Sequence, residues 1–416
     1  MTMSFRNDGS SRYSEGNKWG AFPSVALAWR IGDEDFIKEV DFISDLKIRT
    51  SWGQTGSQAI SPYTTLNLLN AGLTVINDQL VNTFAPGSRL PGDLQWETTE
   101  QFDFGFDLGL LDNRIFVTAD YYVKNTSDLL NTVVLPSSLG FTSTIQNVGS
   151  VQNKGFELGV TAKVLTGEFN WDLSSNISIN RNKITKLYNG EDIFTSRVSI
   201  LAINDPVQIL KEGSPIGQFW GFVEDGYDDE GFINVVDQNE DGFINAEDKT
   251  FIGDANPDFI YGLNSSMSYK NFNLTLFIQG SQGNDIFNAS LIIPTNDFGQ
   301  GINAPRDLFS DHWTPQNTNA KYPLISRSTD AYASDRWIED GSYMRLRNIE
   351  LAYNIPIENN WLRSAQVYFS GQNLLTLTNY SWWDPEVNSR GAGQPGIDHL
   401  TYPIPKTVTV GVRVGL

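Results

Sequence analysis

The last ten residues of the chain, 407–416, alternate strictly between apolar and polar side chains, and this pattern constrains the fold most strongly. Four valines and a leucine fall on one face, and the other face carries threonine, glycine and arginine. Successive side chains of a β-strand point to opposite faces, so this segment is predicted to be a strand with one apolar and one polar surface. About ten residues is also the length that a tilted strand needs to cross a bilayer. The segment therefore favours a membrane-spanning strand over an ordinary half-buried one.

Further segments with the same alternation occur in pairs along the chain. In the clearest pair, residues 101–110 and 115–124 are separated by the turn-forming residues 111–113. The other predicted strands cover residues 20–31, 46–53, 156–164, 169–179, 259–269, 272–278, 349–355 and the region around 367–369. These segments give about eleven strands, and residues 2–8 form a remnant of another.

The connections between the predicted strands alternate between short and long. Short turns cover residues 111–113, 166–168 and 270–271, and long connections cover 125–153, 181–258, 280–342 and 373–406. A strand meander through a membrane alternates in this way when one side carries tight turns and the other carries functional loops. A soluble β-sandwich has no requirement to place its short turns on one side and its long loops on the other. We therefore predict an all-β fold, an antiparallel transmembrane β-barrel with short periplasmic turns and long extracellular loops.

Composition agrees with a membrane crossing made by strands. Apolar residues make up 40% of the 416 residues and aromatic residues 12%, but no apolar run approaches the roughly 18 residues of a spanning helix. The sequence contains no cysteine, which excludes disulfides, thiolate metal sites and cysteine nucleophiles. The formal net charge of −20 argues against nucleic acid as a partner, because phosphates require a basic surface.

Seven sequence blocks carry a resemblance to a known family. They are KWGAFPSV at 18–25, LKIRTSWGQTG at 46–56, LQWETTE at 94–100, NVGSVQNKGFE at 147–157, NPDFIYG at 256–262, DGSYMRLR at 340–347 and TYPIPK at 401–406. In this order they resemble the C-terminal half of the SusC/RagA-type TonB-dependent outer-membrane transporters, and the resemblance extends across nearly the whole chain. Several blocks in the right order are specific, whereas any one alone is weak.

The resemblance implies a barrel of about 22 strands in the lipid of the bacterial outer membrane. It also implies a plug domain inside the barrel, a SusD-like lipoprotein lid, and import of oligosaccharides or peptides powered by TonB. The chain departs from the family pattern, because it has no plug, no TonB box and no first half of the barrel, and the pattern continues upstream of Met1. We therefore expect residues 1–416 to be the C-terminal part of such a transporter. A fragment of this kind also explains the missing export signal.

Polar residues on the predicted strands would face the lumen of the barrel. Those singled out here are Asp103, Asp107, Glu157, Lys163 and Arg413. In the intact protein they would surround the plug and a substrate path.

One stretch of the long loop at 181–258 has the spacing of a calcium-binding loop. Oxygen-bearing positions 1, 3, 5, 7, 9 and 12 of such loops, with glycine at position 6, match a run that begins at Asp237. The ligands would be Asp237, Asn239, Asp241, the carbonyl of Phe243, Asn245 and Asp248. The last position is aspartate instead of the usual glutamate. Such an ion would order the loop, and the alternative is a solvated acidic turn.

Aromatic residues in the long loops are candidates for ligand contact. Trp220 and Tyr227 lie in the largest loop, and Trp382 and Trp383 lie in the last one. Sugars stack on such rings, and the resemblance makes sugars plausible ligands. Aromatic residues in long loops also pack a loop onto itself, and the sequence leaves this alternative open.

No catalytic arrangement is visible in the sequence. The two histidines, His312 and His399, lie in predicted loops without the serine and aspartate partners of a triad. We therefore predict a transporter and not an enzyme. The alternative from another class is a secreted all-β glycan-binding or adhesin module with a calcium-stabilised loop.

Overall fold

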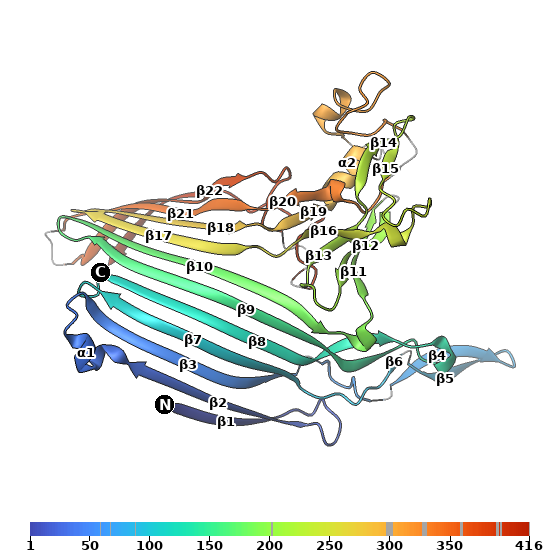
Figure 1. Cartoon of the computed structure of the whole chain (residues 1–416), viewed down its shortest axis with the longest axis horizontal. Helices are drawn as coiled ribbons and strands as arrows, with labels where there is room; N and C mark the ends of the chain where they lie inside the picture. The colour runs from blue at the N-terminus through green and yellow to red at the C-terminus, as the bar shows by residue number, and fades with distance from the viewer. Residues whose placement is uncertain are drawn as a thin grey trace.

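One large curved antiparallel sheet dominates the structure (Figure 1). The computed structural model describes residues 1–58, 60–66, 68–87, 89–200, 203–296, 303–326, 331–357, 361–387, 391 and 393–415. The strands of the sheet follow one another in chain order: β1 (Thr2–Gly9), β2 (Trp19–Arg30), β3 (Ile43–Ser57), β7 (Glu97–Leu110), β8 (Ile115–Val134), β9 (Ser143–Leu165), β10 (Phe169–Lys186), β17 (Phe259–Tyr269), β18 (Phe272–Gln282), β21 (Tyr343–Asn354), β22 (Ser364–Thr378) and β24 (Thr407–Gly415). The predicted strands and the remnant at residues 2–8 are thus confirmed. Leu416 lies outside the described residues.

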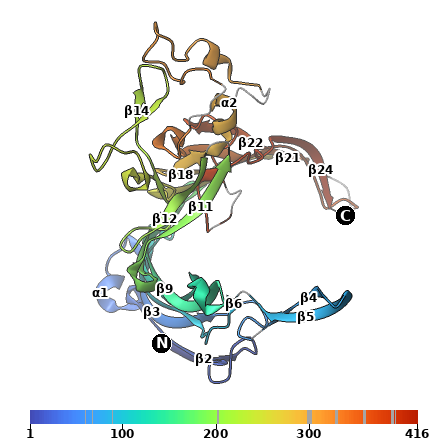
Figure 2. The same ribbon diagram turned by 90° about the vertical axis from the view of Figure 1, so that its right-hand side faces the viewer.

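The sheet forms the wall of a barrel that is not closed. Figure 2 shows it as an open curve with β2 near one edge and β24 at the other. Within the described part of the chain, β1 pairs only with β2, and β24 pairs only with β22. A short strand, β6 (Arg89–Leu90), adds a parallel pairing to β9.

Short turns and long connections lie at opposite ends of the sheet, as predicted. The turns after β7, β9 and β17 lie at the end that also carries the start of β1 and the end of β24 (Figure 1). Residues 111–113 and Lys270 at these turns adopt positive φ, the backbone conformation of a tight reversal. The long connections after β3, β10, β18 and β22 lie at the other end.

The register places apolar side chains of neighbouring strands on the convex face. Phe104 of β7 lies opposite Tyr121 of β8, and Val410 of β24 lies opposite Phe369 of β22. Paired residues of an antiparallel ladder project from the same face, so these contacts form a continuous apolar surface. The side chain of Val410 is 73% exposed in the isolated chain, which suits a surface covered by lipid.

Strands β8 and β9 are longer than the sequence predicted. Residues 125–153 were expected to form one long connection, but the ladder continues through 125–134 and 143–153, interrupted by irregularities near Leu129. These segments are rich in asparagine, glutamine, threonine and serine, so they lack the apolar contrast by which strands were recognised. At about 3.3 Å per residue, the 20 residues of β8 rise about 66 Å, roughly twice the hydrocarbon thickness of a bilayer.

The long connections fold into small sheets that share one core. A four-stranded sheet contains β11 (Ile193–Ile200), β12 (Ile203–Leu210), β13 (Gln218–Gly221) and β16 (Thr250–Asp254), and a three-stranded sheet contains β19 (Asp285–Asn288), β20 (Ile338–Asp340) and β23 (Ile397–Asp398). The core that joins them includes Val198, Phe219, Phe287, Ile292, Trp337 and Ile397. Beside it lie the two-stranded sheet of β14 (Glu224–Tyr227) and β15 (Ile233–Val235) and the helix α2 (Ile292–Asn296). Connections far apart in sequence therefore form one folded extracellular unit.

A separate hairpin of β4 (Leu69–Ile76) and β5 (Gln79–Pro86) projects from the end of the large sheet that carries the long connections (Figure 1). Its apolar side chains Leu73, Leu80 and Phe84 are more than half exposed. Among the described residues, no helix is both long enough and apolar enough to cross a membrane.

Candidate functional site

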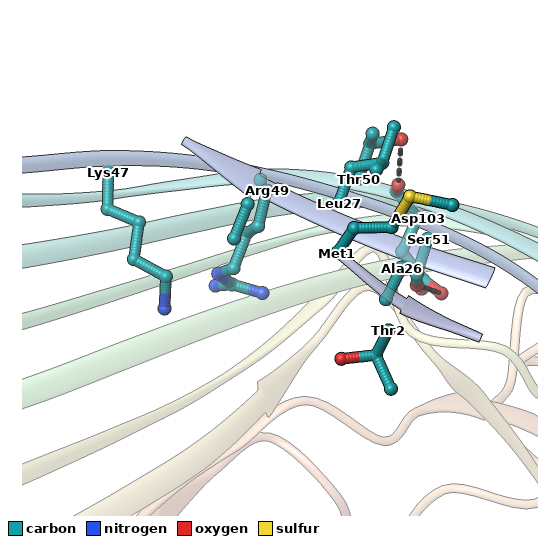
Figure 3. Close-up of a pocket in the computed structure, with 11 residues that line it drawn as sticks. Met1, Thr2, Ala26, Leu27, Lys47, Arg49, Thr50, Ser51 and Asp103 are labelled. Atoms are coloured by element: carbon teal, nitrogen blue, oxygen red, sulfur yellow. Dashed lines mark hydrogen bonds between the residues drawn. The ribbon is translucent and has the colours of Figure 1, made fainter. Parts of the chain in front are cut away.

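The concave face carries ionised side chains near its N-terminal edge. Arg49 of β3 reaches Asp120 of β8 at 2.7 Å and Asp107 of β7 at 3.2 Å, and Lys47 lies 3.4 Å from the same Asp107. Positions 47 and 49 share one face of the strand because side chains alternate. Figure 3 shows Lys47 and Arg49 projecting into the space around which the sheet curves, beside a cavity of about 300 Å³.

A second group of ionised side chains lies near the C-terminal edge. Arg413 of β24 contacts both carboxylate oxygens of Glu350 on β21 and the amide oxygen of Gln366 on β22. The guanidinium of Arg413 also lies 4.0 Å from the ring centroid of Tyr368. One cation thus links three strands of the inner wall.

Between these two groups lies a cavity whose lining is uncharged. This cavity of about 530 Å³ across β8, β9, β10, β17 and β18 is lined by glycine, serine, threonine, asparagine, valine and phenylalanine. Phe116 and Phe277 supply its aromatic surface. The concave face therefore carries an uncharged cavity between its two charged groups, and the charged residues Lys163 and Asp172 lie farther along β9 and β10.

The residues predicted to face the lumen lie on this concave face. Ser51 donates to Asp103 at 3.0 Å, and Asp103 and Glu157 line one cavity of about 690 Å³ together with Arg49. Lys163 lies opposite Asp172 of β10, and on the same face of β9 as Glu157, from which it lies an even number of positions along the strand. The alternation in the sequence thus assigned the inner face correctly.

A buried ionic network ties the last long connection to the extracellular end of β21. Arg345, of which only 2% is exposed, donates to Asp384 at 2.6 Å and also pairs with Glu386. Arg347 pairs with the same Glu386. Burial raises the pKa of Asp384, but Arg345 and the backbone N–H groups of Glu386 and Ile404 more than offset it, so the pKa lies below its ordinary value. Asp384 is therefore held as a carboxylate.

In the predicted calcium loop, backbone N–H groups donate hydrogen bonds to the loop's own side-chain oxygens. Asp237 accepts from the backbone N–H of Gly242 at 2.7 Å, and Asp241 accepts from that of Phe243 at 2.8 Å. Asp248 accepts from the N–H groups of Gln238 and Asn245, and the N–H of Asn245 lowers the pKa of Asp248 most strongly. Gly242 has a φ of +84°, which glycine adopts without strain and which turns the loop at position 6.

The remaining predicted ligands lie in the same turn. Asn239 accepts from the N–H of Asp241 at 3.1 Å, and Asn245 accepts from that of Glu247 at 2.8 Å. The described residues contain no cluster of three or more His, Cys, Asp or Glu side chains placed to hold a metal ion. Any ion here would therefore need the asparagine oxygens and the Phe243 carbonyl as well as the carboxylates.

The structure separates the four aromatic candidates for ligand contact. Trp220 on β13 packs edge-on against Phe251 at 5.1 Å, within the four-stranded sheet. Trp382 and Trp383 stack on each other with ring centroids 5.2 Å apart, and Trp382 lines a cavity among the loops. Tyr227 is joined to that cavity through Arg336, which donates to its hydroxyl at 3.2 Å. Trp382 and Tyr227 therefore belong to one region, and Trp220 belongs to another.

Sequence reasoning missed the charged residues around this cavity. Arg336 donates to Glu224 at 2.6 Å, although the two are 112 residues apart. Burial raises the pKa of Glu224, and Arg336 opposes part of this rise. Lys321 lies 2.8 Å from Asp307, and its hydrogen bond lowers the pKa of that carboxyl. No motif marks these residues, because the fold alone brings them together.

An antiparallel sheet with an apolar convex face, a polar concave face and all its long connections at one end defines an outer-membrane β-barrel. Comparison with protein families shows which kind of outer-membrane barrel this is. The family described as "TonB dependent receptor-like, beta-barrel" matches residues 1–374. The chain belongs to this family of outer-membrane receptors, which are transporters and not enzymes.

Individual relatives agree with this assignment. TonB-dependent receptor P3 of Formosa agariphila is 37% identical, and TonB-dependent receptor SusC of Bacteroides thetaiotaomicron is 35% identical; each match covers 100% of the chain and 44% and 42% of the relative. The solved structure of the RagAB peptide transporter matches 99% of the chain and 45% of its own chain, with 27% identity and a TM-score of 0.86. The chain thus spans less than half the length of the curated relatives it matches. These matches do not favour a secreted adhesin.

Proposed function

We propose that the chain forms the C-terminal part of the barrel of a TonB-dependent importer of oligosaccharides or peptides. The observation that carries this proposal is the polar concave wall, on which a cavity with an uncharged lining lies between two groups of ion pairs. The charged groups suit contacts with a plug domain, and the uncharged cavity lining offers a neutral polar ligand a surface without strong electrostatic attraction or repulsion. The likeness to the RagAB peptide transporter supports peptides, and the resemblance to SusC/RagA-type transporters supports both substrate classes.

The partners of the intact protein are a SusD-like lipoprotein and TonB. The likeness to SusC and to the RagAB structure supports the lipoprotein, and membership of the receptor family supports TonB. The folded extracellular unit provides a structured surface at the end where such a lipoprotein would sit.

Deletion and uptake in the native bacterium test this proposal. The complete reading frame that contains residues 1–416 is deleted, and the strain is grown on fractionated oligosaccharides or peptides as its only carbon source. We expect growth to be lost on one fraction and restored by the wild-type gene but not in a strain lacking TonB. Equal growth of the deletion strain on every fraction would contradict the proposal. An affinity tag on the restored protein tests for co-purification of the lipoprotein.

We further propose that the loop 237–248 binds calcium as a structural ion. Asp237, Asn239, Asp241, Asn245 and Asp248 offer side-chain oxygens, and Phe243 offers its carbonyl, all of which are ligands that calcium prefers. The turn at Gly242 supports this reading, because a calcium loop needs a sharp reversal at this position. The ion would order the loop that joins β15 to β16 and take no part in transport chemistry.

A further inference from the structure

The connection between β2 and β3, residues 31–42, lies at the periplasmic end of the sheet (Figure 1). It contains a 3₁₀ turn, η1 (Ile31–Asp33), and a short helix, α1 (Asp35–Lys38). The turns after β7, β9 and β17 are much shorter and comprise residues 111–114, 166–168 and 270–271. Figure 2 shows α1 on the outer side of the curved sheet, away from the lumen. The connection is therefore longer than a strand reversal needs, and it lies beside the wall that faces lipid.

A hydrogen bond holds this connection against the convex face. The indole N–H of Trp29, near the end of β2, donates to a carboxylate oxygen of Glu34 at 3.0 Å. Trp29 lies opposite Ile48 of β3, and the next residue of β3, Arg49, projects into the lumen. Because neighbouring residues of a strand point to opposite faces, Ile48 and its partner Trp29 project from the convex face. Glu34 accepts this hydrogen bond and therefore lies on the convex side as well.

The connection exposes two phenylalanine side chains on an ordered backbone. Phe36 in α1 is 62% exposed, and Phe42, directly before β3, is 57% exposed. The N–H of Ile37 donates to the carbonyl of Glu34 at 3.0 Å. The N–H of Leu111 donates to the carbonyl of Phe42, also at 3.0 Å. Exposed phenyl rings are unfavourable in water, whereas the headgroup region of a bilayer readily accepts aromatic rings.

A row of aromatic residues on the wall marks the level of the membrane boundary. Four residues are successive cross-strand partners on β10, β17, β18 and β21: Phe169, Tyr269, Phe272 and Tyr353. Tyr353 lies opposite Val367, two positions from Phe369 of the convex face, so the row is convex. Aromatic girdles of this kind are typical of the level at which a barrel wall meets the headgroups. The connection 31–42 lies at the same end of the sheet and continues the lipid-facing wall there.

The charge of the connection distinguishes between kinds of lipid. Residues 31–42 contain one basic residue, Lys38, and five acidic residues: Asp33, Glu34, Asp35, Glu39 and Asp41. Lys38 lies 3.2 Å from Asp35, so the remaining carboxylates leave a net negative charge. Anionic headgroups are repelled by this charge, whereas the ammonium of a zwitterionic headgroup is attracted.

We propose that residues 31–42 anchor the barrel in the periplasmic leaflet of the outer membrane, among zwitterionic phospholipids that carry an ammonium group. Phe36 and Phe42 insert at the level of the headgroups, as the apolar side of an interfacial helix does, and the carboxylates face the ammonium groups and water. The proposal goes beyond the import function, because it concerns how the wall contacts lipid and holds for any imported molecule.

Spin labels on the complete protein in lipid vesicles test the anchor. Phe36→Cys and Phe42→Cys are labelled with a nitroxide in a background without other cysteines. Collisions of each label with oxygen, which partitions into lipid, are compared with collisions with a water-soluble nickel chelate, and we expect both labels to favour oxygen. Asp35→Cys is the matched control from the same helix, because the side chain of Asp35 is fully exposed and points about 100° away from that of Phe36. Its label should favour nickel, as should the label of Asp229→Cys in the extracellular turn between β14 and β15.

Labels at Phe36 and Phe42 that favour nickel as strongly as the label at Asp229 would overturn the anchor. If the periplasmic domain of TonB then shields these labels from nickel, the surface binds a protein instead of lipid. Heat-modifiable migration on gels confirms that each labelled variant folds. None of these measurements depends on transport, so the anchor can fail while the import function stands.

The composition of the vesicles tests the kind of lipid. Vesicles of phosphatidylcholine and phosphatidylethanolamine are compared with vesicles in which phosphatidylglycerol replaces the ethanolamine lipid. We expect the preference of the Phe36 and Phe42 labels for oxygen to decrease in the anionic vesicles. An unchanged preference would overturn the assignment of an ammonium headgroup.

Discussion

Arg413 on β24 donates to both carboxylate oxygens of Glu350 on β21, at 2.8 and 3.0 Å, across the intervening strand β22. The two parallel hydrogen bonds form the planar fork that arginine makes with a carboxylate. The pair therefore joins strands that are not neighbours, on the concave face and close to the end that carries the short turns.

Charge reversal tests this pair. Arg413→Glu places a carboxylate beside Glu350, and we expect the complete barrel to unfold at a modestly lower temperature, because both side chains are partly exposed and the interaction is screened. Heat-modifiable migration on gels measures the midpoint of unfolding. The double variant Arg413→Glu with Glu350→Arg should recover most of the loss. A double variant no more stable than the single one would mean that the pair does not stabilise the wall.

The assignment of the two faces is tested by adding the same charge to adjacent positions of β24. Val410→Asp places a carboxylate on the apolar face, where we expect a cost on the order of 2 kcal/mol within the bilayer. Thr409→Asp adds the same charge to the polar face, opposite Ser370, and should assemble nearly normally. The yield of folded barrel in outer-membrane fractions compares them. Equal yields would contradict the assignment of the convex face to lipid.

The buried carboxylate of Asp384 predicts a pH dependence for the last long connection. The pKa of Asp384 is lowered in the folded protein, so its contribution is present above the unfolded pKa of about 3.9 and is lost as the pH falls through the lower folded pKa. We expect hydrogen-exchange protection of residues 379–387, corrected for intrinsic rates, to be constant from pH 7 to about 4 and to fall below it.

Substitution of Asp384 separates this effect from general acid unfolding. Asp384→Asn leaves Arg345 with one carboxylate partner fewer in a buried setting, and we expect a loss of about 3 kcal/mol of local stability already at pH 7. Asp229→Asn changes an exposed loop carboxylate and serves as the control. Full protection of residues 379–387 in Asp384→Asn at neutral pH would show that the network is not required.

The calcium proposal predicts a protection that depends on metal. Asp241→Ala removes a ligand oxygen, so we expect cleavage by protease within residues 225–255 even at millimolar calcium. Glu240→Gln keeps the shape of a side chain at a position that provides no ligand, and should remain protected. Cleavage is followed by mass spectrometry on the complete barrel in detergent, with and without chelator. Protection that ignores both chelator and Asp241→Ala would leave an acidic turn held by its own hydrogen bonds.

The sequence predicted the strands and their faces wherever apolar and polar residues alternate. In β7, for example, phenylalanines alternate with aspartate and glycine, so the sequence alone identifies the apolar face and the polar face of the strand. The outer part of β8 was missed because Asn125, Thr126 and Ser127 are polar on both faces, and only their pairing with the neighbouring strands makes them extended. Pattern reasoning therefore succeeds in the lipid-facing part of the wall and weakens beyond it.

The candidate site was less predictable for a different reason. Trp220 and Trp382 have the same side chain in similar polar loops, yet one packs against Phe251 and the other lines a cavity. Glu224 and Arg336 become partners only because connections from opposite sides of β17 and β18 fold onto one core. Residue type indicates what a side chain can do, but the fold decides which side chains meet.

The outer parts of β8 and β9, which continue the ladder well past the thickness of a bilayer, have a consequence for how such receptors diverge. Lipid constrains only the part of each strand that lies within the bilayer. The part beyond the bilayer can therefore lengthen or shorten in evolution without changing the membrane anchor. Each such change must add or remove residues in twos, since a single insertion would exchange the inner and outer faces of everything beyond it. The irregularities near Leu129 are positions where one extra residue can be absorbed. Related receptors can thus differ in the height of the rim on this side while keeping the same pore wall.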